Sequence, residues 1–215
     1  MISSLDVMSK GRVILGIGAG WMREEFEAID APDFDARGRV TDEYLQAFRI
    51  LWTEQNPTFH GEHVTFNDLI FEPKPVQPRG PRIWAGGESK AAKRRASTLT
   101  EGWFPVGNNP KFPLDTMERY SAAQDEVKDL SQNADRDPAA LDFAYWAIWP
   151  WTGGAETTTD GERRLLTGTA EDLKGDVKRF EDRGVRNLSI MLLGGSLDKT
   201  LDNMDRFADQ IMSKI

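Results

Sequence analysis

The run "GRVILGIGAGW", residues 11–21, sets the interpretation of the whole chain, because an apolar β-branched stretch ends there in closely spaced glycines. A strand that turns into a helix through glycines is typical of dinucleotide-binding sites, whose pattern is G-x-G-x-x-G. Gly16 and Gly18 fit that pattern, but Trp21 stands where the third glycine should be. The spacing therefore favours a tight strand-to-helix turn over a dinucleotide fingerprint, since glycine adopts backbone conformations closed to other residues.

The composition is that of an acidic globular protein. With 215 residues, 39% of them hydrophobic, the chain is long enough for one sizeable core or two small ones. The net charge of −8 repels nucleic-acid phosphates and anionic membranes, so neither is an expected partner. The sequence has no cysteine, and its start, MISSLDVMSKGR, lacks the regions of a signal peptide, so a cytoplasmic protein is expected.

Strand-like and helical runs alternate along the chain. Strands are expected at residues 12–17, 82–85, 102–106, 141–149 and 187–193. Helices are expected at residues 35–52, 89–99, 111–130, 169–183 and 197–213. Thr169 is the expected N-cap of the fourth helix, with Asp172 three residues on. Residues 57–68, PTFHGEHVTFND, predict a small β-hairpin around Gly61.

This alternation predicts a parallel sheet, and enlarged loops after the strands favour a TIM-type (β/α) barrel over a doubly wound sheet. A complete barrel has eight strand–helix units in about 250 residues, whereas five units are expected here. We therefore expect a single α/β domain over residues 1–215, an incomplete TIM-type barrel. Its outer strands, 13–17 and 188–193, would have unpaired edges, which predicts a homo-oligomer.

Five blocks, in this order, resemble the bacterial luciferase-like superfamily, in particular its oxidoreductase branch that depends on the deazaflavin F420. They are GRVILGIGAGWMREEFEAI, RGRVTDEYLQAFRILWTEQNPTFHGEHVTFND, FEPKPVQPRGPRIWAGGESKAAKRRA, EGWFP and GTAEDLKGDVKRFEDRGVRNLSIMLL. The resemblance implies a barrel that holds F420, or alternatively FMN, at the carboxyl ends of its strands. It also implies that GRVILGIG is the fourth strand, so that the first three strands of the family are lacking.

Residues 82–95, RIWAGGESKAAKRR, are expected to hold the phosphate of the cofactor. A strand ends in Gly86 and Gly87 and a helix opens at Ser89, so backbone N–H groups and a hydroxyl converge on the positive end of a helix dipole. The resemblance implies that this anion site receives the cofactor through these three residues. Glu88 is discordant, because its carboxylate would repel phosphate unless it points to solvent. The alternative is a plain strand-to-helix turn.

Glycines and tryptophans at other strand ends complete the candidate cofactor site. Gly18, Gly20 and Trp21 follow the first strand, and Trp103 lies in EGW, where a barrel places its ligand. The resemblance implies that the two tryptophans wall the cofactor or substrate pocket. The alternative for both is core packing, because indole rings are mostly buried wherever they fall.

No catalytic residue follows from the sequence. In some F420-dependent sugar dehydrogenases of this superfamily, a glutamate after the fourth-strand glycines serves as an acid. In this sequence Trp21 stands at that position. Glu24 and Glu25 lie one helical turn beyond. In an apolar pocket the pKa of either carboxyl group would rise, which would suit it to act as an acid. On an exposed helix both would be ordinary solvated charges. His60 and His63 supply at most two of the ligands that zinc needs, so no metal is expected.

Three function hypotheses remain open. The first is an F420- or FMN-dependent oxidoreductase that transfers hydride to, or monooxygenates, a small organic substrate. The second is a non-catalytic flavin- or deazaflavin-binding protein that keeps the phosphate site. The third is an inactive, truncated member of the family.

Overall fold

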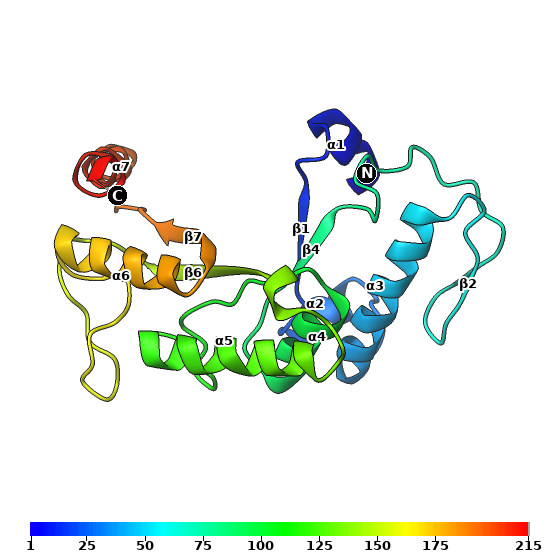
Figure 1. Ribbon diagram of the computed structural model, residues 1–215, viewed down its shortest axis with the longest axis horizontal. Coiled ribbons are helices and arrows are strands. Elements are labelled where there is room, and N and C mark those ends of the chain that lie inside the picture. The colour runs from blue at the N-terminus through cyan, green and yellow to red at the C-terminus, as the bar shows by residue number, and fades with distance from the viewer. Residues whose placement is uncertain (215) are drawn as a thin grey trace.

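The computed structural model describes residues 1–214 as a half-barrel, a curved parallel sheet of five strands with helices along its outer side (Figure 1). The strand order is β1-β4-β5-β6-β7, so each strand pairs with the next main strand along the chain. The strands are β1 Ile14–Ile17, β4 Arg82–Ala85, β5 Gly102–Trp103, β6 Asp142–Pro150 and β7 Val185–Met191. The expected incomplete TIM-type barrel is confirmed, with five of the eight strands of a complete barrel.

The helices follow the strands, and Figure 1 shows α3 to α6 along one side of the sheet with α1 and α7 at its two ends. They are α1 Ile2–Ser9, α2 Arg23–Ala28, α3 Arg37–Thr53, α4 Lys90–Leu99, α5 Met117–Gln132, α6 Ala170–Asp182 and α7 Leu197–Gln210. Short 3-10 turns lie at Phe34–Ala36, Pro138–Ala140 and Met212–Lys214. The expected capping box of α6 is confirmed. The side chain of Thr169 accepts the backbone N–H of Asp172, and the side chain of Asp172 accepts the backbone N–H of Thr169. Within residues 1–214, every helix is too short or too polar to traverse a lipid bilayer.

The helix expected from residue 111 begins later, at Met117. Thr116 is its N-cap, and its side chain accepts the N–H of Arg119. The segment before it is held as a loop by a buried contact with β6, because the hydroxyl of Tyr145 donates to the carbonyl of Leu114 at 2.7 Å. A long-range hydrogen bond therefore decides where this helix starts.

The strand expected at residues 102–106 ends at Trp103. Pro105 has no N–H to donate, so the ladder to β6 is interrupted there and continues only as an isolated bridge between Val106 and Trp146. The chain instead leaves the sheet as a loop above the carboxyl ends of the strands.

An aromatic cluster between the sheet and α5 and α6 forms the centre of the core. Trp103, Tyr120, Tyr145 and Phe180 are fully buried. Trp103 stacks on Tyr120 at 5.8 Å between ring centroids, and Tyr145 lies 4.9 Å from Phe180. Such pairs contribute about 0.5–1.5 kcal/mol each beyond their buried area. The cluster fixes β5 and β6 against both helices.

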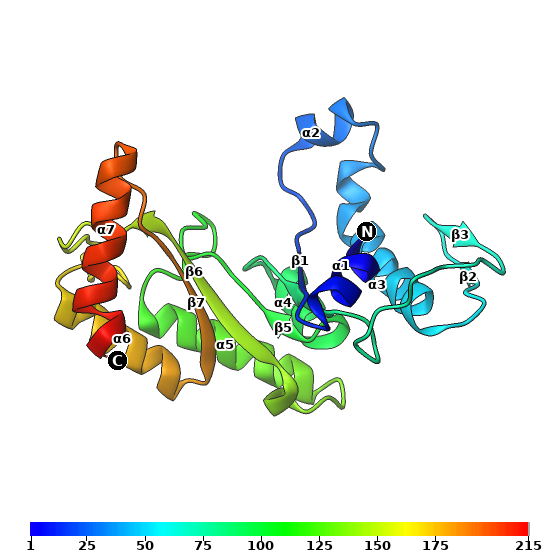
Figure 2. The same ribbon diagram turned by 90° about the horizontal axis from the view of Figure 1, so that it is seen from above.

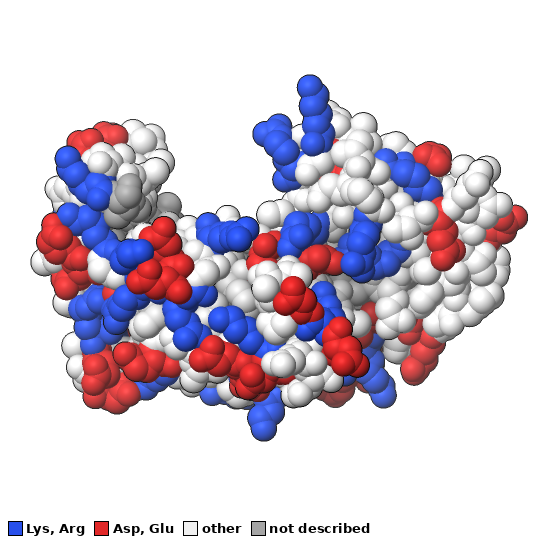
Figure 3. Space-filling view, viewed as in Figure 1, with Lys and Arg blue, Asp and Glu red and all other residues white. Residues whose placement is uncertain are grey.

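The two outer strands of the sheet, β1 and β7, are each paired on one side only. Ile14 on β1 is 45% exposed, and α7 beside β7 leaves an apolar stripe of Leu197, Leu201 and Met204 exposed. Figure 3 shows the open hollow between the two ends of the molecule. Unpaired strand edges and exposed apolar helix faces favour association with another chain.

We therefore expect the chain to self-associate. Light scattering at low protein concentration should detect species larger than one chain. Leu201→Lys, which places a charge in the apolar stripe of α7, should reduce them while changing the free energy of unfolding by less than about 0.5 kcal/mol. A monodisperse, thermally stable monomer that binds no dye for apolar surface would contradict this expectation.

The hairpin expected around Gly61 is confirmed, and it is docked on α3 by one carboxylate. Its strands are β2 Phe59–His60 and β3 Thr65–Phe66, paired antiparallel, and Figure 2 shows them at the end of the molecule beyond α3. Glu43 of α3 accepts the backbone N–H groups of Glu62 at 3.1 Å, His63 at 2.8 Å and Val64 at 2.7 Å. Burial alone would raise the pKa of Glu43, but these three hydrogen bonds outweigh it and hold the pKa below its ordinary value.

Docking of the hairpin should therefore weaken in acid. A carboxyl whose pKa is lowered by folding contributes stability above its unfolded pKa and loses it as pH falls through the folded value. The amide signals of His63 and Val64, followed by NMR, should titrate with a midpoint below the ordinary pKa of a glutamate. Glu43→Gln should speed hydrogen exchange at both amides, whereas Glu54→Gln, at the exposed end of α3, should not. A midpoint at or above the ordinary pKa of a glutamate would contradict the docking role.

Candidate cofactor site

The carboxyl ends of β1, β4 and β5 meet at one edge of the sheet, and the candidate glycines lie there. The N–H of Gly86 donates to the carbonyl of Ile17 at 2.8 Å, which sets the turn after β4 beside Gly18. The N–H of Phe104 donates to Ala85 at 3.0 Å, which brings β5 to the same edge. The structure thus brings together three of the predicted strand ends, and ligands of barrel folds bind at this edge.

The turn from β4 into α4 has the geometry of an anion cradle. Gly87 has a φ of +100°, and a Cβ there would come within 2.9 Å of the Cβ of Ala92, so a side chain is excluded twice. Ser89 is the N-cap of α4, and its Oγ accepts the N–H of Ala92 at 3.2 Å. The N–H groups of Ser89, Lys90 and Ala91 have no carbonyl of α4 as acceptor, and they lie at the positive end of the helix dipole.

Glu88, the discordant residue of this turn, points neither to solvent nor into the cradle. It is 4% exposed. Its Oε1 accepts the N–H of Val106 at 2.8 Å, and its Oε2 accepts the amide of Asn109 at 2.7 Å. The carboxylate is therefore aimed at the loop after β5 and satisfied by it. Glu88 holds that loop beside the cradle, a role that leaves room for a phosphate.

Trp103 lies in the core, so the structure places its ring in the packed interior and not on an open pocket wall. Its indole N–H nevertheless reaches the site, because Nε1 donates to the carbonyl of Gly87 at 2.9 Å. The fully buried ring thus fixes the backbone of the cradle from below. Trp103 therefore holds the turn after β4 in position.

The residues after β1 lie at the same edge but in the open. Trp21 is 78% exposed, so it is not a core residue. Gly20 has a φ of +83°, and its carbonyl accepts the Nε of Arg37 at 3.2 Å. Gly18 and Gly20 are also exposed. These three candidates flank the cradle without closing over it.

An aromatic row on the concave face of the sheet was not anticipated from the sequence. Successive strand residues point to opposite faces, so Trp84 and Trp146 point away from the helices that cover Ile83 and Tyr145. Phe104 lies between the two indoles, 6.0 Å and 6.4 Å from them between ring centroids. These three residues lie on or directly after three different strands, so no local sequence pattern predicts that they form a row.

The acid–base and metal candidates are not assembled at the cradle. Glu24 and Glu25 are exposed on α2, as solvated charges would be. His60 is exposed at the hairpin, and His63 is half-buried there. Over residues 1–214, no group of three or more His, Cys, Asp and Glu side chains is arranged to hold a metal ion.

Comparison with known proteins identifies the class. The model of the luciferase-like monooxygenase family matches residues 1–150, and the chain belongs to this family. It is 33% identical to the FMNH2-dependent dimethylsulfone monooxygenase of Pseudomonas putida over 138 residues, which are 62% of this chain and 38% of that protein. It is 39% identical to an uncharacterized protein of Mycobacterium tuberculosis over 215 residues, which are 100% of this chain and 63% of that protein. The chain thus spans less than two thirds of the length of these curated relatives.

Solved structures share the fold. The monooxygenase RslO1 of Streptomyces bottropensis superimposes with a TM-score of 0.75 at 18% identity, covering 98% of this chain and 71% of that one. An F420-dependent secondary alcohol dehydrogenase, solved with an F420–acetone adduct, gives a TM-score of 0.71 at 17% identity, covering 99% and 72%. The half-barrel is therefore an incomplete barrel of the luciferase-like type.

The bond between Trp103 and Gly87 predicts a specific defect. Trp103→Phe keeps an aromatic ring in the core but removes the donor to the cradle. We expect it to lower the free energy of unfolding by about 1–3 kcal/mol, as loss of a partner to a buried polar group does. Trp21→Phe, at an exposed ring, should change it by less than about 0.5 kcal/mol. Urea denaturation of both variants measures the difference, and equal losses would deny Trp103 this role.

Proposed function

We propose that this edge of the sheet binds F420, with FMN as the alternative, and that the protein is an oxidoreductase acting on a small organic substrate. The observation that carries the proposal is the cradle of Gly86, Gly87 and Ser89 at the start of α4. The relatives support a cofactor of this class, since one depends on FMNH2 and a structural neighbour depends on F420. Such a group, when bound, supplies a ring that gives or takes a hydride.

The donors of the cradle fit a phosphate. Because the Oγ of Ser89 accepts from Ala92, its own hydrogen is left to donate to an anion. The free N–H groups of the first turn of α4 add further donors, and the helix dipole favours the negative charge. The bare Gly87 lets the phosphate approach the backbone closely. Glu88, held by Val106 and Asn109, keeps its charge on the far side of the turn.

The concave face beside the cradle presents aromatic rings on which a planar cofactor ring could stack. Phe104 and Trp146 are half-buried there and stack on each other, so part of each ring remains accessible. Aromatic faces of this kind bind flat conjugated groups by stacking and by excluding water. This row, together with the exposed Trp21, extends the candidate site beyond its phosphate end.

The open edge strands favour a second candidate function, binding without turnover. Enzymes exclude water from the reacting centre, and the hollow between β1 and β7 is open to solvent (Figure 3). A chain with this shape would keep the phosphate cradle and lack an enclosed pocket. Reduction or oxidation of the bound cofactor by added substrates separates the two functions, because the binding protein would show neither.

Gly87→Val tests the cradle itself. Valine cannot adopt the backbone conformation at this position easily, and its Cβ would press on Ala92, so the donors would be displaced. Fluorescence titration with F420 and, separately, with FMN should show affinity weakened by at least about tenfold. Gly175→Val on α6, where a Cβ meets nothing within 4 Å, is the matched control and should bind as the parent does. Equal affinity in Gly87→Val and the parent would overturn the assignment.

A further inference from the structure

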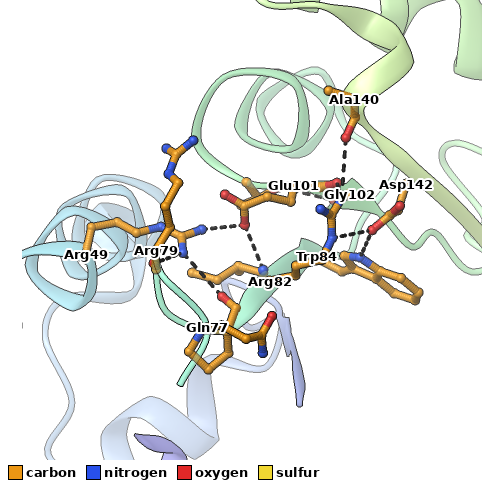
Figure 4. A network of polar contacts seen from close by, with 12 residues as sticks. Arg49, Gln77, Arg79, Arg82, Trp84, Glu101, Gly102, Ala140 and Asp142 are labelled. Atoms are coloured by element: carbon orange, nitrogen blue, oxygen red, sulfur yellow. Dashed lines mark hydrogen bonds and ion pairs between the residues drawn. The ribbon is translucent and has the colours of Figure 1, made fainter. Parts of the chain in front are cut away.

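The opposite edge of the sheet, at the amino ends of β4, β5 and β6, carries a network of arginines and two carboxylates (Figure 4). Arg82 donates to Asp142 at 2.7 Å. Arg49 of α3 pairs with Glu101, and the same oxygen of Glu101 accepts the N–H of Ile83 at 2.8 Å. Each carboxylate is therefore matched with one arginine and held against the strands.

Two further arginines in this network have no carboxylate partner within the described chain. Arg136 donates to the carbonyls of Ser97 at 2.5 Å and Thr100 at 2.8 Å, which are neutral acceptors at the end of α4. The guanidinium of Arg79 is exposed and makes no hydrogen bond to any of residues 1–214, and no dashed line reaches it in Figure 4. Neither guanidinium forms an ion pair with a carboxylate of residues 1–214, although the charge of Glu101 acts on Arg136.

A cavity of about 180 Å³ lies among these groups. Its polar lining consists of Gln46, Arg49, Arg79, Thr98, Glu101 and Arg136. Three guanidinium groups thus face one carboxylate, in a chain whose net charge is −8. The volume is below the roughly 300–1,000 Å³ of sites for drug-sized molecules, so the cavity suits a small ligand.

The charges around Arg136 favour an anion beside it. Burial lowers the pKa of this guanidinium, Glu101 raises it, and the charges of Arg79 and Arg49 lower it again. Repulsion between like charges is relieved when an anion binds between them. An anion bound in this cavity would therefore stabilise the cationic form of Arg136.

We propose that this cavity is a binding site for a small oxyanion of the phosphate or sulfate type. Planar guanidinium groups donate in pairs to such oxygens, and the side-chain donors of Arg79 make no hydrogen bond to residues 1–214. The anion would lie between α3, the segment before β4, the end of α4 and the segment before β6. Arg49 and Arg136 already link these segments through backbone carbonyls, and the anion would add contacts to both arginines. This is the stability face of a barrel, at the other edge from the cofactor cradle, so the anion would tighten the fold.

Calorimetric titration of the chain with inorganic phosphate, at constant ionic strength, tests the proposal. Arg79→Gln removes a charged side chain that makes no hydrogen bond in the described structure, so the fold should be kept. We expect it to weaken phosphate binding by at least about tenfold. Arg39→Gln removes the same charge from an exposed position on α3 and should change the affinity by less than about twofold.

The α4 cradle is a second place where phosphate could bind, and Gly87→Val separates the two sites. Retained phosphate binding in Gly87→Val, together with its loss in Arg79→Gln, supports the arginine site. The proposal is overturned if the parent chain binds no phosphate, if Arg79→Gln and Arg39→Gln behave alike, or if only Gly87→Val loses binding. A rise in melting temperature with phosphate in the parent, missing in Arg79→Gln, is the second expected readout.

Discussion

One hydrogen bond connects the core of this molecule to its candidate site. The indole N–H of Trp103 donates to the carbonyl of Gly87, and the same ring stacks on Tyr120 in the aromatic cluster. The position of the cradle therefore depends on the packing of α5 and α6 against the sheet, and not only on its own turn. The donor ring is fully buried and the acceptor residue Gly87 is half-buried, so loss of the bond would leave the indole N–H without a partner inside the core.

The two edges of the sheet use charge in opposite ways. At the carboxyl edge the one buried carboxylate of the turn, Glu88, is directed at Val106 and Asn109, so the donors of α4 stay free for an anion. At the amino edge, Glu101 and Asp142 neutralise two arginines, and Arg79 and Arg136 remain in excess. The carboxyl edge thus directs its carboxylate at the loop after β5, whereas the amino edge holds more arginines than carboxylates.

The sequence was most informative where structure is local. The strand at 82–85 was predicted to the residue, because Pro81 and Gly86 bound a short apolar run, and the capping box at Thr169 followed from its spacing alone. The start of α5 could not be predicted in this way, because a hydroxyl 31 residues away fixes the loop before it. The orientation of Glu88 depends on partners 18 and 21 residues ahead, and the aromatic row depends on three strands coming together.

The strand order of the half-barrel follows the chain order, so each strand–helix unit lies beside the unit that precedes it in the sequence. No strand has to be inserted between two others, so units could be joined to β1 or β7 without breaking an existing pair. The same sheet could therefore serve as a module for fusion of further units. Its curvature, already set by the helices on one side, would direct each added strand toward closure.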